Sequence, residues 1–101
     1  MVLEIAQFEI IPGREEAFEA AYAEGRALLA QTPGFRNARM TRGVESPSRF
    51  VLLVEWDTVD AHEVGFRGSD RFPAWRALIG PHFAAPPQVE HYADVATAAV
   101  P

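Results

Sequence analysis

The sequence predicts an α+β fold in which two strand-helix-strand halves share one four-stranded antiparallel sheet. Segments rich in β-branched and aromatic residues alternate with helical patterns in the order strand, helix, strand, strand, helix, strand. Pairs of proline and glycine mark several of the boundaries between these segments. The chain has 101 residues, the length of a single domain.

The first half begins with a strand over residues 2–11, which ends at the turn-forming pair Pro12 and Gly13. Residues 14–31 then place apolar side chains at intervals of three and four, which predicts an amphipathic helix. Its glutamates gather in the first turns, where the helix dipole favours negative charge. The Thr-Pro-Gly sequence at 32–34 ends this helix.

Two further strands are predicted over residues 35–44 and 49–56, on either side of a short polar loop that contains a proline. A loop of this size between two strands is typical of an antiparallel hairpin.

The strand over residues 49–56 is apolar on both of its faces. Val51 and Leu53 point to one face, because side chains alternate along a strand. The even-numbered residues point to the other face and are all large and apolar: Phe50, Leu52, Val54 and Trp56. Helices of this fold cover one face only, so we expect a second copy of the chain to cover the other. The expected partner is therefore a homodimer formed through the sheet faces.

The second half predicts a helix in two pieces. Asp57 or Thr58 can cap the first piece, in which Val59, His62 and Phe66 follow at helical spacing. Gly68 interrupts the pattern. Ser69 or Asp70 can cap the second piece, which ends at Gly80-Pro81 and carries an apolar stripe: Phe72, Trp75, Leu78 and Ile79.

Residues 88–95 predict the last strand, and residues 96–101 have too few large side chains to anchor themselves and are expected to fray. The domain is therefore expected to span residues 1–95. The order of elements is that of the ferredoxin-like split βαβ arrangement. The first and third strands belong in the middle of its sheet, and they are the most apolar here.

Composition narrows the class of function. The chain is 49% hydrophobic with a net charge of −5, and its nine basic residues are scattered among fourteen acids, which excludes a phosphate-binding surface for nucleic acid. Cysteine is absent, so there is neither a disulfide nor a thiolate site. No basic-flanked leader and no apolar run of about 18 residues occurs. We expect a soluble, cytoplasmic protein without a membrane partner.

Two of the three histidines are candidate catalytic residues. His62 is predicted to face inward, and His91 alternates with Val89 and Ala93 on the last strand, so both face an apolar layer. Each could be a hydrogen-bonded core histidine, or the pair could line a cavity and supply a general base near neutral pH. The histidines lack metal-ligand spacing and no further ligands can be nominated, so neither a metal nor another cofactor is expected.

Other side chains could complete such a cavity. Arg67 and Arg76 could reach it as cations, and Tyr22 as a polar wall. The aromatic residues of the second half would ordinarily be core packing, but they could also form walls for a flat apolar ligand: Trp56, Phe66, Phe72 and Trp75.

Several motifs together resemble the antibiotic biosynthesis monooxygenase (ABM) domain family. The resemblance covers about residues 3–93 and is carried by PGREEAFEAAY, TPGFRNARMTRGVESPSRFVLLVEWDT, AHEVGFRGSDRFPAWRAL and VEHY. It implies a dimeric α+β barrel made from two ferredoxin-like subunits. Some members of the family oxidise anthrones or quinols with O₂ and use neither metal nor flavin. Others have no demonstrated activity, act as isomerases or are associated with stress.

The resemblance suggests roles for the candidate residues. His62 could remove a proton from a small aromatic substrate, Arg67 or Arg76 could stabilise the resulting anion, and the aromatic side chains could hold the ring system. A non-catalytic dimer of the same fold that binds a metabolite, or a stress-related one, is the alternative.

A haem-degrading enzyme is disfavoured. Relatives with that activity use an Asn on the first strand, a Trp on the second helix and a haem-ligating His after it. The corresponding residues here are Ala6, Phe66 and Arg76, so all three differ.

Overall fold

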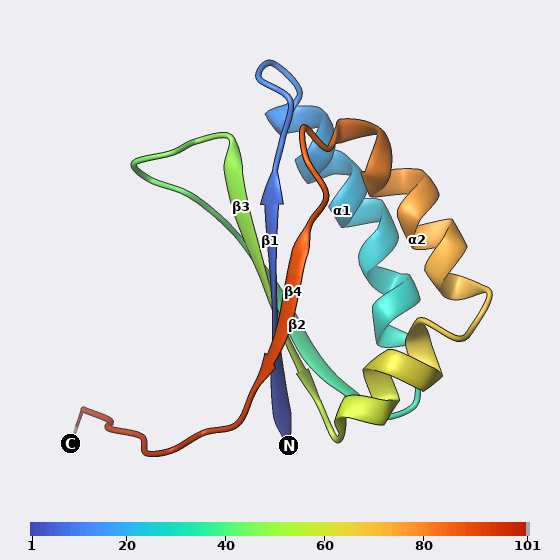
Figure 1. Ribbon diagram of the computed structural model, residues 1–101, viewed down its shortest axis with the longest axis vertical. Coiled ribbons are helices and arrows are strands. Elements are labelled where there is room, and N and C mark those ends of the chain that lie inside the picture. Colours follow the sequence, from blue (N-terminus) through green and yellow to red (C-terminus); the bar gives the residue numbers. More distant parts are fainter. Residues whose placement is uncertain (101) are drawn as a thin grey trace.

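The computed structural model describes residues 1–100 and confirms the predicted order of elements (Figure 1). The strands and helices are β1 (Val2–Glu9), α1 (Glu15–Ala30), β2 (Phe35–Arg42), β3 (Arg49–Trp56), a π-helix (Ala61–Phe66), α2 (Arg71–Ile79), a 3₁₀ turn (Gly80–His82) and β4 (Gln88–Tyr92).

The four strands form one antiparallel sheet in the order β2-β3-β1-β4. The central positions of β1 and β3 are those predicted from their apolar character. In the middle of the sheet, Ala6 of β1 lies opposite Leu52 on one side and Val89 on the other. The ferredoxin-like α+β fold is confirmed.

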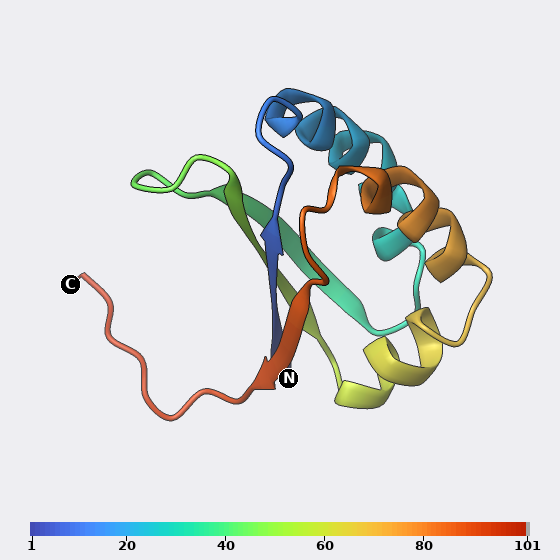
Figure 2. The same cartoon turned by 45° about the horizontal axis from the view of Figure 1, so that its top comes forward.

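Both α-helices lie on the same face of the sheet (Figures 1 and 2). The even-numbered residues of β3 face these helices and are at most 1% exposed: Phe50, Leu52, Val54 and Trp56. Val51 and Leu53 point to the opposite face and are partly exposed. In the described part of the chain no helix covers that second face. The helices therefore cover one face only, as predicted, and leave the apolar side chains of the other face without a cover.

Three of the four strands are shorter than the sequence predicts, whereas β3 has the predicted bounds. The first was expected to reach residue 11, but Ile10 forms only an isolated bridge with Phe83, and the Ile11 amide donates to the His82 carbonyl at 2.9 Å. The chain has turned towards the 3₁₀ segment there. The second was expected to reach residue 44 and ends at Arg42.

The last strand was expected to reach residue 95 but ends at Tyr92. Tyr92 pairs with Leu3, and β1 begins only one residue earlier, so the following residues run out of partners. Residues 96–100 have no helix or strand, and the last residue of the predicted frayed tail, 101, lies outside the described residues.

The broken helix of the second half is confirmed, and its first piece is a π-helix. The Arg67 amide donates to the His62 carbonyl at 2.9 Å, a bond that spans five residues rather than four. The Thr58 hydroxyl accepts from the Ala61 amide at 3.1 Å and is the cap that the sequence suggested. Val59 was expected on the inward stripe but is 40% exposed, because it precedes the first turn of the π-helix.

Glycine is required where the two pieces meet. A Cβ atom on Gly68 would lie 2.4 Å from the Val64 carbonyl oxygen, far inside van der Waals contact. A residue with a side chain would force the connection open. Among residues 1–100, no helix has the length and apolar character needed to cross a bilayer.

Candidate active site

A cavity of about 720 Å³ lies between the sheet and the helical layer, within the size range of small-molecule sites. Strands β1, β3 and β4, both α-helices, the π-helix and the connection at residues 83–87 contribute to its wall. The lining is mostly aliphatic and aromatic. Four polar side chains interrupt it: Glu4, His62, Arg67 and Arg76.

Glu4 is one of two site residues that were not predicted from the sequence. Side chains alternate along β1, so Glu4 shares the helix-facing side with Ala6 and Phe8, and it is only 5% exposed. The Trp56 indole Nε1 donates to its Oε1 atom at 2.9 Å. Burial raises the pKa of Glu4 to about 7, although the bond from Trp56 opposes this shift. The shared parity with Ala6 and Phe8 is the signal that could have revealed it.

His62 lies beside Glu4 in the cavity wall and is 4% exposed. Its Nε2 atom is 3.4 Å from Glu4 Oε1, and its ring stacks on the Trp56 indole with centroids 5.3 Å apart. Burial is the main reason that the pKa of His62 is lowered to about 4. Glu63 opposes this shift, whereas the nearby His91 and Arg67 add to it. His62 is therefore a neutral imidazole at pH 7, and it is a weak base on its own.

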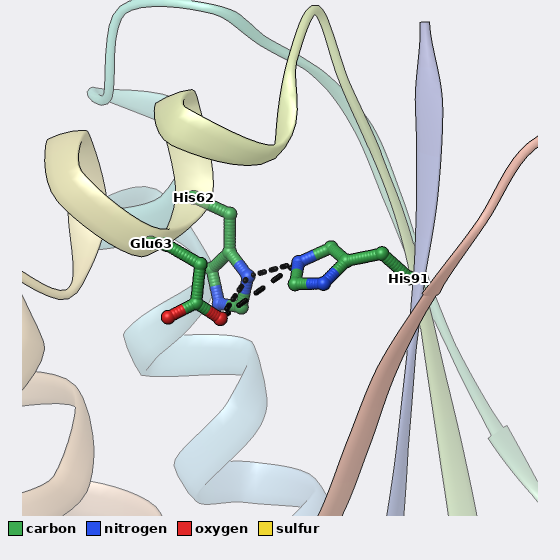
Figure 3. A group of neighbouring side chains, drawn as sticks. All are labelled: His62, Glu63 and His91. Carbon is green, nitrogen blue, oxygen red and sulfur yellow. Dashed lines mark hydrogen bonds and ion pairs between the residues drawn. The ribbon is translucent and has the colours of Figure 1, made fainter.

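His91 of β4 meets His62 of the π-helix, which is one of the two alternatives that the sequence left open, but His91 does not line the cavity as that alternative expected. His62 Nδ1 and His91 Nε2 lie 2.8 Å apart, a hydrogen-bond distance (Figure 3). The side chain of His91 is 19% exposed, so it stands between the buried imidazole and solvent. Glu4, His62 and His91 form a continuous polar path from the cavity towards the surface.

Glu63 joins this path at its outer end and was not predicted. Its Oε1 atom lies 3.7 Å from His62 Nδ1 and 4.0 Å from His91 Nε2 (Figure 3). Its Oε2 atom lies 3.4 Å from Arg67 Nη1. The outer end of the path therefore gathers two imidazoles and a carboxylate.

Both predicted arginines reach the cavity wall. The guanidinium of Arg67 lies 5.0 Å from the centroid of the Phe72 ring, and that of Arg76 lies 6.0 Å from it. Arg76 also lies over Phe83, at 5.7 Å. Such contacts hold a cation against an apolar wall.

The predicted aromatic residues divide into two groups. Phe66, Phe72 and Trp75 line the cavity. Trp56 is fully buried behind it and supports Glu4 and His62 instead. The structure does not bring Tyr22 to this cavity. Tyr22 follows the buried residue Ala21 on α1, and its ring centroid lies 6.0 Å from that of Trp75. Its side chain lines a separate hollow near β2.

Comparison with known proteins agrees with this fold. The sequence profile of the family described as antibiotic biosynthesis monooxygenase matches residues 1–78. The protein YczJ of Bacillus subtilis is 35% identical over 95 residues, which is 94% of this chain and 100% of that protein.

Solved structures give the same result. A candidate antibiotic biosynthesis monooxygenase of Bordetella bronchiseptica is 44% identical, with a TM-score of 0.91 over 94% of this chain and 97% of that one. SnoaB of Streptomyces nogalater, a cofactor-independent oxygenase solved as a point mutant, has a TM-score of 0.82 at 19% identity over 95% of this chain and 94% of that one. At that identity the likeness concerns the fold. The profile match and the two closely related sequences show that the chain belongs to the antibiotic biosynthesis monooxygenase (ABM) family.

Proposed function

We propose that the protein is a cofactor-independent monooxygenase that oxidises a small aromatic substrate of the anthrone or quinol type with O₂. The observation that carries this proposal is a buried carboxylate, Glu4, at the wall of an apolar cavity, with the imidazole of His62 beside it and that of His91 next to His62. Family membership and the name of SnoaB, a cofactor-independent oxygenase of the same fold, support it.

Glu4 is the base in this proposal. A general base works best when its pKa is near the working pH, and the pKa of Glu4 is raised to about 7. The pKa of His62, at about 4, makes it a poor first acceptor. His62 was the candidate base predicted from the sequence. We assign His62 instead a position beside Glu4, from which it receives the proton.

The proton leaves along the polar path. A movement of about half an ångström brings Glu4 Oε1 and His62 Nε2 from 3.4 Å to hydrogen-bond distance. A proton taken up at Nε2 is matched by release from Nδ1 to His91 Nε2, 2.8 Å away. His91 then passes it to solvent, and Glu4 is restored.

The anion left behind needs a cation and a dry site. Arg67 and Arg76 provide positive charge at the wall, and Phe66, Phe72 and Trp75 exclude water from the ring system. The anion gives its electrons to O₂. One oxygen atom forms the new carbonyl of the product. The other leaves as water with the two hydrogens that the oxidised carbon of an anthrone loses, so no external reductant is needed.

We also propose that two chains associate through the sheet face that the helices leave open. The apolar residues on that face are only partly exposed in one chain: Leu3, Ile5, Val51 and Leu53. A second copy would cover them and complete the dimeric barrel that the family resemblance implies. Sedimentation equilibrium at micromolar concentration should give twice the mass of one chain, and a stable monomer would contradict this proposal.

Oxygen uptake tests the activity. Chelator-treated protein should consume O₂ with an anthrone or hydroquinone in a one-to-one ratio, and the rate should fall by about 100-fold or more in Glu4→Gln. Isotopic ¹⁸O₂ should place one label in the product. If a broad panel binds in the cavity without turnover, the oxygenase assignment is wrong and the protein is a binding module of the same fold.

A further inference from the structure

We propose that His62, Glu63 and His91 form a binding site for a divalent transition-metal ion, and that the bound ion closes the outer end of the proton path. One ligand atom from each of the three residues lies within 4.8 Å of the others. The existence of this site does not depend on the proposed oxidation. Its inhibitory consequence rests on that function.

The donor distances are close to those of a metal centre. Neighbouring ligand atoms on a tetrahedral Zn²⁺ with bonds of about 2.0–2.1 Å lie about 3.3 Å apart. The two imidazole nitrogens, 2.8 Å apart, need to separate by about half an ångström. The Glu63 oxygen, at 3.7 and 4.0 Å from them, needs to approach by a similar amount. Its side chain is 38% exposed, so it has room to turn.

The three side chains come from two elements that are held by the fold. His62 and Glu63 are neighbours on the π-helix, and His91 projects from β4 towards them (Figure 3). The π-helix and β4 therefore already hold the three side chains on either side of the place that an ion would take.

The surroundings orient two of the ligands. Glu4 faces the Nε2 atom of His62, which leaves Nδ1 for an ion, and Trp56 holds Glu4 in place. A carboxylate on the far nitrogen of a ligating histidine is the usual outer support of metal sites. Arg67 lies beside the Oε2 atom of Glu63, whereas the Oε1 atom faces the histidines.

The donor set selects the class of ion. Two imidazoles and one carboxylate suit Zn²⁺, Co²⁺ or Fe²⁺, whereas Mg²⁺ and Ca²⁺ prefer a shell of oxygen atoms. Three protein ligands leave further positions for water. Of the three ligands only His62 lines the large cavity, so the ion would lie at the edge of the substrate space, on the side of Glu63 and His91.

An ion in this position would inhibit oxidation. It would bind His62 Nδ1 and His91 Nε2, the two atoms that pass the proton outward in the metal-free protein. The pocket would still bind its ligand, but Glu4 could no longer be relieved of its proton through His62.

Titration of chelator-treated protein with Co²⁺ tests the site directly. We expect one Co²⁺ per chain, visible d–d absorption of low-coordinate cobalt, and displacement of the cobalt by Zn²⁺ measured by calorimetry. His91→Asn and Glu63→Gln should each weaken binding at least tenfold. Glu90→Gln is the matched control, because Glu90 is next to His91 on the opposite side of β4 and is exposed.

Each result decides the proposal. Absence of Co²⁺ binding by calorimetry, or equal affinity in wild type, H91N and E63Q, would show that no ion binds these residues. Circular dichroism checks that H91N folds. If H91N does not fold, E63Q still tests the site, because it changes only a partly exposed side chain.

A separate assay tests the inhibition. If an oxidised substrate is found, Zn²⁺ should lower the rate, and the concentration for half inhibition should rise at least tenfold in E63Q. Inhibition that is equally strong in E63Q would contradict the blocked path. The two proposals can fail separately. The cobalt titration tests the metal site even if no substrate is found, and oxygen uptake in the presence of chelator tests the oxidation even if no cobalt binds.

Discussion

The two ends of β1 and β3 differ sharply, although both ends face the same helical layer. At one end, Phe8, Phe18 and Phe50 pack with ring centroids 5.5 and 4.8 Å apart and at most 3% exposure. At the other end, the same strands bury Glu4 against Trp56 and His62. The aromatic end is what a stable core requires. The polar end buries groups that prefer water, a cost that points to function.

The largest effect is expected at the aromatic end. Phe18→Ala removes a fully buried ring and should lower the free energy of unfolding by about 3–5 kcal/mol. Urea unfolding followed by circular dichroism measures this loss. Val44→Ala is the control, since Val44 is 87% exposed and should change stability by less than about 0.5 kcal/mol. A loss below about 1 kcal/mol for Phe18→Ala would show that the aromatic end is not the part of the core that stabilises the fold.

Glu4→Gln should have the opposite profile at the polar end. The amide keeps an oxygen that can accept from Trp56 and removes a buried acid, so the free energy of unfolding at pH 8 should stay equal or rise. Oxidation should fall about 100-fold, because the base is gone. Measuring both quantities on one preparation sharpens the contrast. Lost stability with unchanged turnover per folded molecule would make Glu4 a structural residue.

The pH dependence of stability should reveal two opposed titrations. The raised pKa of Glu4, about 7 against 4.5, gives stability that is present below pH 4.5 and is lost as the pH rises through 7. The lowered pKa of His62, about 4 against 6.5, gives stability that is present above pH 6.5 and is lost as the pH falls through 4. Between pH 4.5 and 6.5 the two slopes offset each other.

Removing one partner should expose the other. Relative to wild type, Glu4→Gln should gain stability as the pH rises from 4.5 to 6.5, and His62→Asn should lose it, each with a slope of up to about 1.4 kcal/mol per pH unit. Urea unfolding in chelator at half-unit pH steps measures this. Parallel curves for the two variants would mean that these groups titrate normally.

The smallest effect is expected from the cations of the wall. Arg76→Gln should weaken binding of an anionic substrate analogue about tenfold without changing the affinity for its neutral counterpart. Arg26→Gln is the control, because Arg26 lines the separate hollow beside Tyr22. An equal loss for neutral and anionic ligands would assign Arg76 a packing role over Phe72 and Phe83.

Most of the fold follows from local patterns in the sequence. The alternation in residues 49–56 predicted that β3 is apolar on both faces, and Gly68 predicted the break in the second helical region. The inward direction of His62 and His91 indicated that the two could meet. These inferences need only the period of an element and its place in the sheet.

The remaining site residues depend on contacts between distant elements. An acid within a strand ordinarily indicates a solvent-exposed face, and Glu4 is explained only once the register places it opposite Val54 and diagonally next to Trp56. Glu63 follows His62 directly in the chain, but its approach to β4 depends on the wide turn of the π-helix. Tyr22 was expected at the cavity, and one step of rotation around α1 places it elsewhere.

The bond from the Arg67 amide to the His62 carbonyl closes a turn with one residue more than an α-helix has, and the site depends on that extra residue. If the same residues formed an ordinary α-helical turn instead, the Phe66 amide would bond to that carbonyl, and everything that follows would rotate by about 100° relative to His62. Phe66 and Arg67 would then leave the cavity wall, although every side chain of the polar path would still be present. The extra residue of this turn is therefore what lets His62, Phe66 and Arg67 line one cavity.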